Sequence, residues 1–249
     1  MTSLVAIEIR RILARRFLHL MALAAVAGGV IAGLLVYLAS HATYSVLDLQ
    51  GTLEGTTVPF VLASWLLGAS FVGAEWRAGT MTTLLTWEPQ RIRVILAKAL
   101  AAALAAAALT FVLQCAIGAM LLPGALKHGS ATISGPWLRF VGGVLGRGAA
   151  LAAMAAVVGL AIGSIGRNTA FGLGVGFVYL AILEGGLLGN FFPGMRRWLL
   201  VGNSIIFVTG RPQFEVNGRS VIGAGLLLAV YAAGALLVAA AIFRSRDVT

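Results

Sequence analysis

The sequence has few charged residues for its length. Of its 249 residues, 10% are charged and 60% are hydrophobic, whereas a soluble globular chain carries about 25% charged residues. A soluble fold of this size has too much surface to be covered by so little polar material. The composition therefore excludes a soluble protein and predicts an integral membrane protein whose apolar surface faces lipid.

Cysteine and clustered histidine are also scarce. The single cysteine, Cys115, lies in an apolar run, cannot form an intrachain disulfide, and is expected to be a small buried hydrophobic side chain. His19, His41 and His128 are scattered, and no paired carboxylates occur. The sequence therefore predicts no metal site.

Motifs for phosphate binding and catalysis are missing too. No Gly-x-x-x-x-Gly-Lys-Ser/Thr sequence occurs, and neither Lys98 nor Lys127 follows a glycine, so the chain cannot bind ATP in the P-loop manner. Gly172-x-Gly174-x-Gly176 lies within a predicted span, where glycines favour close helix packing over phosphate binding. We predict no catalytic residue and no cofactor in this chain.

The net charge of +10 comes from residues in short segments between apolar runs. Nucleic-acid binding is rejected because these residues are not gathered into a soluble domain. Cationic residues at such places set membrane topology and contact lipid headgroups.

Six segments are long and apolar enough to cross a bilayer, which requires about 20 mostly apolar residues. They are Phe17–Ala39, Thr57–Gly73, Val94–Leu122, Phe140–Ser164, Thr169–Leu188 and Val221–Phe243. The first exceeds the roughly 7–15 apolar residues of a signal peptide, which favours a retained anchor. We predict an all-α integral membrane protein with one transmembrane domain, residues 1–249.

Lysines and arginines are divided unequally between the two sides of the predicted membrane. Eleven lie on the side of the termini and six on the other, and His41–Thr56 has none. Because cationic loops stay in the cytoplasm, both termini are predicted to be cytoplasmic. Abundant alanine, glycine and arginine beside two lysines point to a bacterial source, and hence to a bacterial cell membrane.

Two segments outside the spans have patterns of their own. Segment 189–220 is too apolar for a free loop and too interrupted for another span. We predict one or two short re-entrant helices in the outer leaflet, anchored by Trp198, because backbone at that depth must be covered; an interfacial loop is the alternative.

Residues 1–16 predict an amphipathic helix on the cytoplasmic surface, either as a partner contact or as a plain anchor. Its polar face would carry Glu8, Arg11 and Arg15.

The cytoplasmic loop 75–93, after the second span, is compact. Gly79 permits a sharp turn, and Thr80 can cap a helix N-terminus. Met81–Thr86 would form a short helix, which ends near Trp87 because the residue before Pro89 avoids helical geometry. The return to the headgroups would be marked by Arg91, Arg93 and Lys98. This pattern favours a rigid helix–turn that contacts another protein.

This loop resembles the conserved loop of ABC-type-2 export permeases, the six-span membrane subunits of ATP-driven exporters. The resemblance rests on Glu75, Gly79-Thr80, Leu84-Leu85, Pro89, Arg91 and Lys98. In that family an acidic residue closes the second span, and the following short helix docks into a cleft on the ATPase subunit. The span count, the N-terminal helix and the broken segment before the last span are similar as well.

The resemblance implies a permease subunit that forms half of an export path with a second, identical or related, permease. Spans two and five would line that path, and their apolar character favours multidrug or lipid-like cargo.

Met81–Trp87 would be the coupling helix to a separate ABC ATPase, which would bind ATP and Mg, and the N-terminal helix would flank that ATPase. The implied coupling residues are Glu75, Arg77, Gly79, Thr80, Met81, Leu84, Leu85, Trp87, Pro89 and Arg91. An incidental loop, a non-transporting anchor or assembly subunit, and an intramembrane enzyme are the alternatives.

Two charged residues lie deep within predicted spans, whereas Lys98 is one turn inside the start of its span. Arg147 is 17 residues before Ser164 and Glu184 is 16 residues after Asn168, so both lie about 25 Å from the intervening turn. An unpaired charge in lipid costs about 2.5–3.5 kcal/mol. We predict an Arg147–Glu184 ion pair or a shared polar cavity, with separate snorkelling to the headgroups as the alternative.

Overall fold

The computed structural model describes residues 2–38, 44–88, 90–128, 133–188, 191–211 and 218–245, and these residues contain helices and no strand. The predicted all-α class is confirmed. In chain order the elements are α1 (Thr2–Leu13), α2 (Arg16–Leu38), α3 (Val46–Arg77), α4 (Thr80–Trp87), α5 (Arg91–His128), α6 (Gly135–Gly166), α7 (Thr169–Phe177), the π-helix η1 (Val178–Leu188), the 3-10 helix η2 (Pro193–Trp198), α9 (Leu200–Thr209) and α10 (Val221–Ser245).

Five of the described helices, α2, α3, α5, α6 and α10, are long and apolar enough to span a membrane. The chain is therefore a multi-pass membrane protein. The segment predicted as the fifth span starts as α7 and continues as η1, and its apolar helix, Thr169–Gly185, is shorter than the other five. The structure thus supports five of the six predicted spans by length, and the remaining one stays a prediction.

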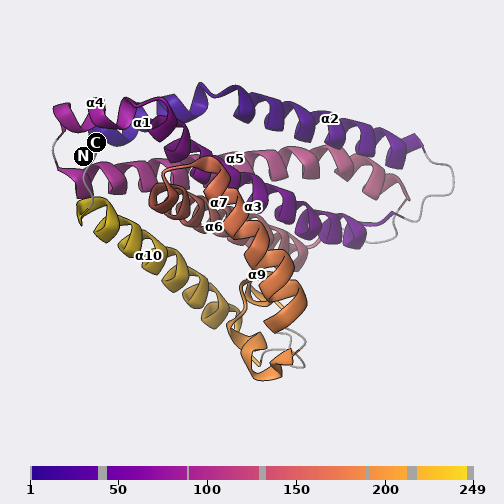
Figure 1. The fold of residues 1–249 in the computed structure, drawn as a ribbon. Coiled ribbons are helices and arrows are strands. Elements are labelled where there is room, and N and C mark those ends of the chain that lie inside the picture. The colour runs from indigo at the N-terminus through magenta and orange to yellow at the C-terminus, as the bar shows by residue number, and fades with distance from the viewer. Residues whose placement is uncertain are drawn as a thin grey trace.

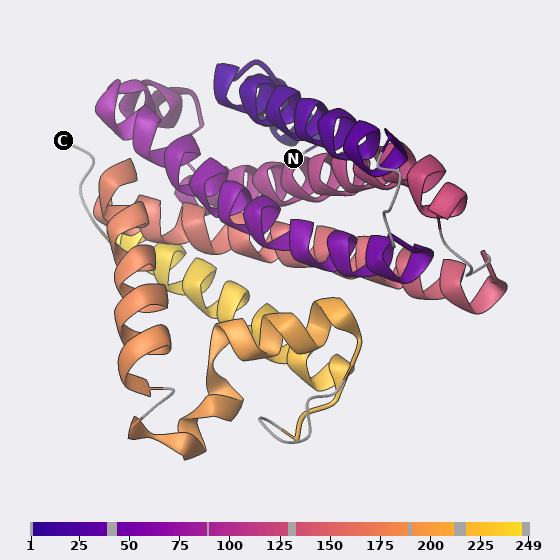
Figure 2. The same ribbon diagram turned by 90° about the vertical axis from the view of Figure 1, so that its right-hand side faces the viewer.

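The long helices pack closely where glycines replace larger side chains. Figures 1 and 2 show α2 beside α5 and α3 beside α6, and α10 crossing obliquely. A Cβ on Gly159 of α6 would overlap the backbone of Trp65 on α3, and one on Gly33 of α2 would overlap Met120 of α5. In contrast, Gly142 has open space where a Cβ would lie. Small residues thus permit two close helix crossings.

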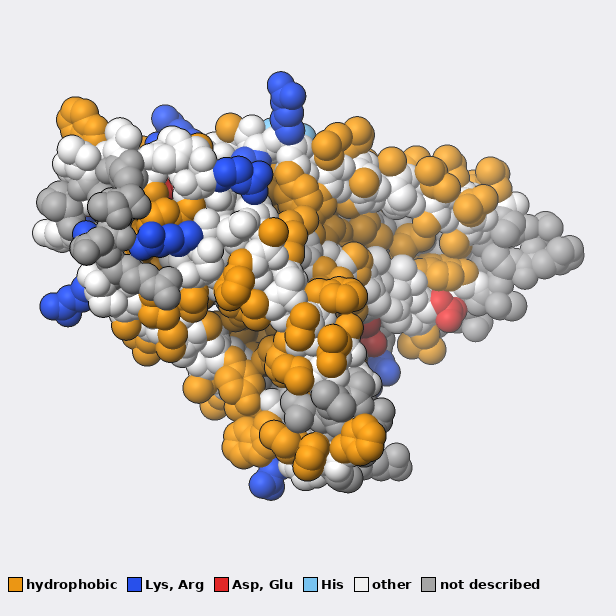
Figure 3. Space-filling view, viewed as in Figure 1, with side chains coloured by type: hydrophobic (Ala, Val, Ile, Leu, Met, Phe, Trp, Pro, Cys, Tyr) orange, Lys and Arg blue, Asp and Glu red, His pale blue; other side chains and the backbone are white. Residues whose placement is uncertain are grey.

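Both termini lie at one end of the molecule, together with α1 and α4 (Figure 1). We call this end the terminal face, and the opposite end, where α2 ends and α3 begins, the far face. On the side seen in Figure 3, the Lys and Arg side chains gather mainly toward the terminal face. The start of α1 and the end of α10 therefore lie at the same face, and their cytoplasmic location stays a prediction.

Two further expectations, on Cys115 and on segment 189–220, have separate outcomes. Cys115 is exposed on the surface of the chain, so the prediction of a buried cysteine is wrong; its side chain lies on a helix face that no described element covers. Among the described residues of segment 189–220 are two short helices, η2 and α9. Whether they are re-entrant helices in the outer leaflet stays a prediction.

Candidate functional site

A buried lysine joins three helices at the terminal face. Lys98, near the start of α5, is 1% exposed. Its Nζ donates to Glu8 Oε1 of α1 at 2.8 Å and lies 2.8 Å from the Glu75 carboxylate of α3. It also lies 4.9 Å from the centre of the Phe71 ring, a distance at which a cation is attracted to the ring face. One ammonium group thus holds α1, α3 and α5 together.

Two arginines complete the Lys98 cluster, which we define as Glu8, Arg11, Arg15, Glu75 and Lys98. Arg11 Nη1 lies 3.6 Å from Glu8 and 3.7 Å from Glu75, with half of its side chain exposed. The Arg15 guanidinium donates to Ser70 Oγ and to the Phe71 carbonyl, both at 3.3 Å. Burial lowers the pKa of Arg15, and the Glu75 and Glu8 carboxylates oppose that shift. Three cations therefore surround two carboxylates.

The N-terminal helix is present, but its faces differ from the prediction. Val5, Glu8 and Ile12 are all buried, at helical spacing on one face, while Leu13 is half exposed. Glu8 was assigned to the polar face. It turns inward because Lys98 supplies a buried counter-ion, without which burying a carboxylate would be prohibitively costly. Arg15 lies beyond the end of α1, at the junction with α2.

The predicted coupling segment forms a separate short helix, α4. Gly79 has a φ of 66° and makes the turn that separates α4 from α3. Thr80 was expected to cap α4, but its hydroxyl donates instead to the Glu75 carbonyl at 3.3 Å, and α4 has no side-chain cap. The helix ends at Trp87, where Glu88 is extended, as the sequence predicted. Pro89 lies outside the described residues.

The two faces of α4 have different environments. Met81 is buried, and Leu84 packs partly against the same core. Trp87 is 85% exposed, and Arg77 at the base of the helix is also exposed. Leu85 is helical, but its side chain is outside the description. The inner face therefore fixes α4 to the bundle, and its end presents an unusually exposed tryptophan.

The start of α5 connects this region to the C-terminal helix. Arg91 donates to the Phe243 carbonyl of α10 at 3.4 Å. The Trp76 and Phe243 rings meet edge to face, with 6.1 Å between their centres, and Arg93 lies 3.6 Å from Glu88. Elements α1, α3, α4, α5 and α10 thus converge at the terminal face.

Sequence reasoning missed the position of Lys98. It was expected to mark the return to the headgroups, but it is buried and bound to two carboxylates. A usable signal was present, because Lys98 is one of only two lysines and stands among Val94, Ile95 and an alanine-rich run. An isolated cation in such a run indicates a buried partner.

The structure does not bring Arg147 and Glu184 together. The ion pairs of the described residues do not include these two side chains as partners. Arg147 donates to the carbonyl of Gly143 at 3.0 Å. The negative charge that acts on its guanidinium is that of Glu54. The predicted ion pair is absent because Arg147 bonds to its own helix α6, while Glu184 bonds to the start of α9.

Glu184 instead binds the N-terminus of α9. Its carboxylate accepts from the backbone N–H of Leu200 at 3.2 Å and from that of Val201. Tyr179 also forms a hydrogen bond with it. The first N–H groups of a helix have no intrahelical partner and attract negative charge. Glu184 therefore fastens η1 to α9.

Comparison with known proteins identifies a family for this chain. Residues 4–182 match the family model described as ABC-2 family transporter protein. The match covers most of the chain, including the Lys98 cluster and α4. No curated protein matches the chain. The chain belongs to the ABC-2 family of transporter membrane proteins.

Proposed function

We propose that this chain is the permease subunit of an ATP-driven exporter in a bacterial cell membrane, with both termini in the cytoplasm. A separate ABC ATPase subunit would bind ATP and Mg, and a second permease would complete the path. Membership of a transporter membrane family supports this proposal. The single observation that carries it is a short exposed helix, α4, seated directly beside a buried charge cluster.

The geometry of α4 suits it to transmit force. Met81 and Leu84 hold it against the core, so it cannot move without moving the end of α3. Glu75, which precedes α4, is bound to Lys98 of α5, and Lys98 is bound to Glu8 of α1. A push on α4 would therefore reach α1, α3 and α5 together through contacts of 2.8 Å.

The partner surface would be centred on Trp87. Tryptophan is enriched among residues that dominate binding energy, because it buries a large area on contact. Trp87 is 85% exposed at the aqueous end of the chain, where nothing in the described residues covers it. A non-transporting anchor would have no use for such a side chain at the tip of a fixed helix. An intramembrane enzyme would need convergent polar residues, and Arg147 and Glu184 have separate partners.

Co-purification tests the proposal. The chain carries an affinity tag and is expressed with its neighbouring genes, and any ATPase subunit that accompanies it is identified and quantified. We expect an ABC ATPase, and we expect Trp87→Ala to reduce its recovery about tenfold, which corresponds to about 1.4 kcal/mol. Trp198→Ala, at an exposed tryptophan far from α4, is the matched control. The proposal fails if the unaltered chain recovers no ATPase, or if the two variants behave alike.

A further inference from the structure

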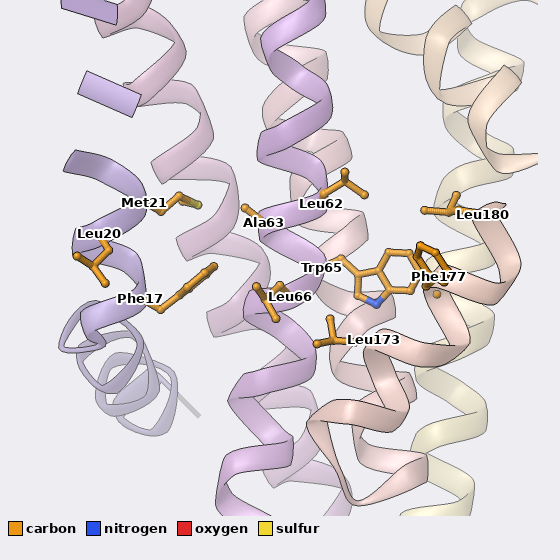
Figure 4. A pocket seen from close by; sticks show the side chains of 11 residues that line it. Phe17, Leu20, Met21, Leu62, Ala63, Trp65, Leu66, Leu173, Phe177 and Leu180 are labelled. Atoms are coloured by element: carbon orange, nitrogen blue, oxygen red, sulfur yellow. The ribbon is translucent and has the colours of Figure 1, made fainter. Parts of the chain in front are cut away.

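Helix α7 packs closely along the part of α3 that leads to the terminal face. At three successive turns, a Cβ added to a glycine of one helix would be too close to an atom of the other. These pairs are Gly73 with Thr169, Gly172 with Ala69, and Gly176 with Trp65. Figure 4 shows the last contact, where the Trp65 ring points from α3 toward Phe177 of α7. Small residues thus bring the two helices together along the length of α7.

This packing sets the distance between the helices more firmly than their register. In two of the three pairs both side chains are small, so the ridges that they form on each helix are shallow. Packed helices with shallow ridges can slide past each other by small amounts, and such shear is a common form of motion. A larger side chain at the end of the row would fix how far along α3 the helix α7 lies.

Such a side chain is present at the turn between α6 and α7. Arg167 is half-buried, and its guanidinium carbon lies 4.6 Å from the centre of the Trp76 ring, at the end of α3. A guanidinium binds well over an aromatic ring because it is planar and cationic. The Trp76 ring also meets Phe243 of α10 edge to face. Arg167 therefore contacts a ring that is itself supported by a second helix.

The backbone at Arg167 indicates that its side chain has a role of its own. Its φ is 51°, and among the described residues it is the only one other than glycine with a positive φ. Its N–H donates to the Ser164 carbonyl at 3.4 Å, where α6 ends. Glycine is the usual residue at such a helix end, because it has no Cβ to strain this conformation. The turn alone would be better served by glycine.

We propose that Arg167 is a positioning residue that fixes the register of α7 on α3 through Trp76. Trp76 lies in the last turn of α3, directly before α4, so a push on α4 reaches Arg167 and moves α7 together with α3. This role rests on the proposed export function, in which these two helices belong to the spans expected to line the path. The register itself is a property of the chain alone.

Distance measurement by electron paramagnetic resonance tests the register in the purified full-length chain in nanodiscs. Cys115→Ser removes the native cysteine, and spin labels are attached at Leu47→Cys of α3 and Val175→Cys of α7, both at exposed positions. Because Val175 lies next to the Trp65 contact, the labels are roughly 30 Å apart along the axis of α3. An excess of unlabelled chain leaves each assembly with one labelled copy. The otherwise unaltered protein should give one narrow distance distribution.

Two variants should broaden this distribution. Arg167→Gly should at least double its width, although glycine suits the turn and should keep the chain folded. Trp76→Leu, which leaves an apolar side chain against Phe243 but removes the ring, should have a similar effect. The double variant should be no broader than either single variant, because both changes remove the same contact. Arg244→Gly, at an exposed arginine in the last turn of α10, is the matched control and should leave the distribution narrow.

The complex with the ATPase tests the transmission of motion to α7. When ATP and Mg are added, α3 and α7 of the unaltered chain should move together, so the distance between the two labels should not change. In Arg167→Gly the distance should shift on addition of ATP, since α3 then moves without α7. A shift of the same size in the unaltered chain would contradict the transmission.

Two results on the chain alone would overturn the positioning role. If Arg167→Gly gave a distribution as narrow as that of the unaltered chain, the arginine would serve only the turn. If Arg244→Gly broadened it equally, the loss of any cation at the terminal face would have this effect. Since this measurement needs no ATPase, a failed co-purification beside a register that depends on Arg167 would refute the exporter proposal alone. A recovered ATPase beside a register independent of Arg167 would refute the positioning role alone.

Discussion

The two ends of this molecule hold their charges in different ways. At the terminal face, Lys98 is 1% exposed and contacts two carboxylates at 2.8 Å. Toward the far face, Arg211 approaches Glu54 at 3.5 Å and its side chain is 61% exposed. Buried ion pairs are costly to break, whereas exposed ones contribute little. We therefore expect the terminal face to move as one body and the far face to open at a small cost.

The largest effect is expected from Lys98→Met. This change leaves Glu8 and Glu75 without their shared counter-ion, and removing one partner of a buried pair costs about 3–5 kcal/mol. The free energy of unfolding, measured in mixed micelles by denaturant titration, should fall accordingly. The other lysine provides the control, because Lys127 is exposed and bonds to the Tyr37 carbonyl, so Lys127→Met should cost much less.

A rescue variant sharpens this result. Adding Glu8→Gln and Glu75→Gln to Lys98→Met removes the unpaired carboxylates, and part of the lost stability should return. If Lys98→Met and Lys127→Met had the same free energy of unfolding, the terminal face would depend on its charges no more than the far face does. The contrast between the two ends would then be wrong.

An intermediate and local effect is expected from Glu184→Ala. The backbone N–H groups of Leu200 and Val201 lose their carboxylate acceptor, and a hydrogen bond to a charged group contributes about 1.5–3 kcal/mol. Hydrogen exchange at the start of α9 should become at least about tenfold faster, with α1 and α5 unaffected. Glu88→Ala at the terminal face should not change exchange in α9. Unchanged exchange in the Glu184 variant would mean that this carboxylate does not hold α9.

The smallest effect is expected from Glu54→Gln. Its partner Arg211 is 61% exposed, although Glu54 itself is 16% exposed. Because the arginine end of the pair is solvated, the loss should not exceed about 1 kcal/mol, and it should shrink further in high salt because screening weakens exposed charges. Denaturant titration at low and high salt measures both quantities. A loss as large as that of Lys98→Met would place a buried charge cluster at the far face as well.

The sequence predicted helices well where apolar runs have charged or polar borders. The first and last spans match α2 and α10 to within about two residues, because Arg16 and Arg244 bound them. The second span was predicted from Thr57, but α3 begins at Val46, where Ser45 and Asp48 form a capping box. A search for apolar runs overlooks such polar starts. The π-helical end of the fifth segment has no recognisable local pattern.

The site was predicted in part. The short helix α4, its glycine turn and its exposed end could be predicted from the sequence, because they depend on residues that are close together along the chain. The partners of Lys98 are 90 and 23 residues away, and the partners of Glu184 lie on a different element. Helical periodicity describes one helix at a time, so it placed Glu8 on a polar face. Lys98 was placed at the headgroups because it follows Arg91 and Arg93. Buried pairing between helices requires the packed structure.

The order of the Lys98 partners along the chain has a consequence for assembly in the membrane. Glu8 and Glu75 both precede Lys98, so both carboxylates have already been synthesised when this lysine leaves the ribosome. Chains generally fold from the N-terminus during synthesis, and the insertion of α5 can be completed by partners that are already in place. Helices α1 and α3 would thus already present both carboxylates when α5 packs against them.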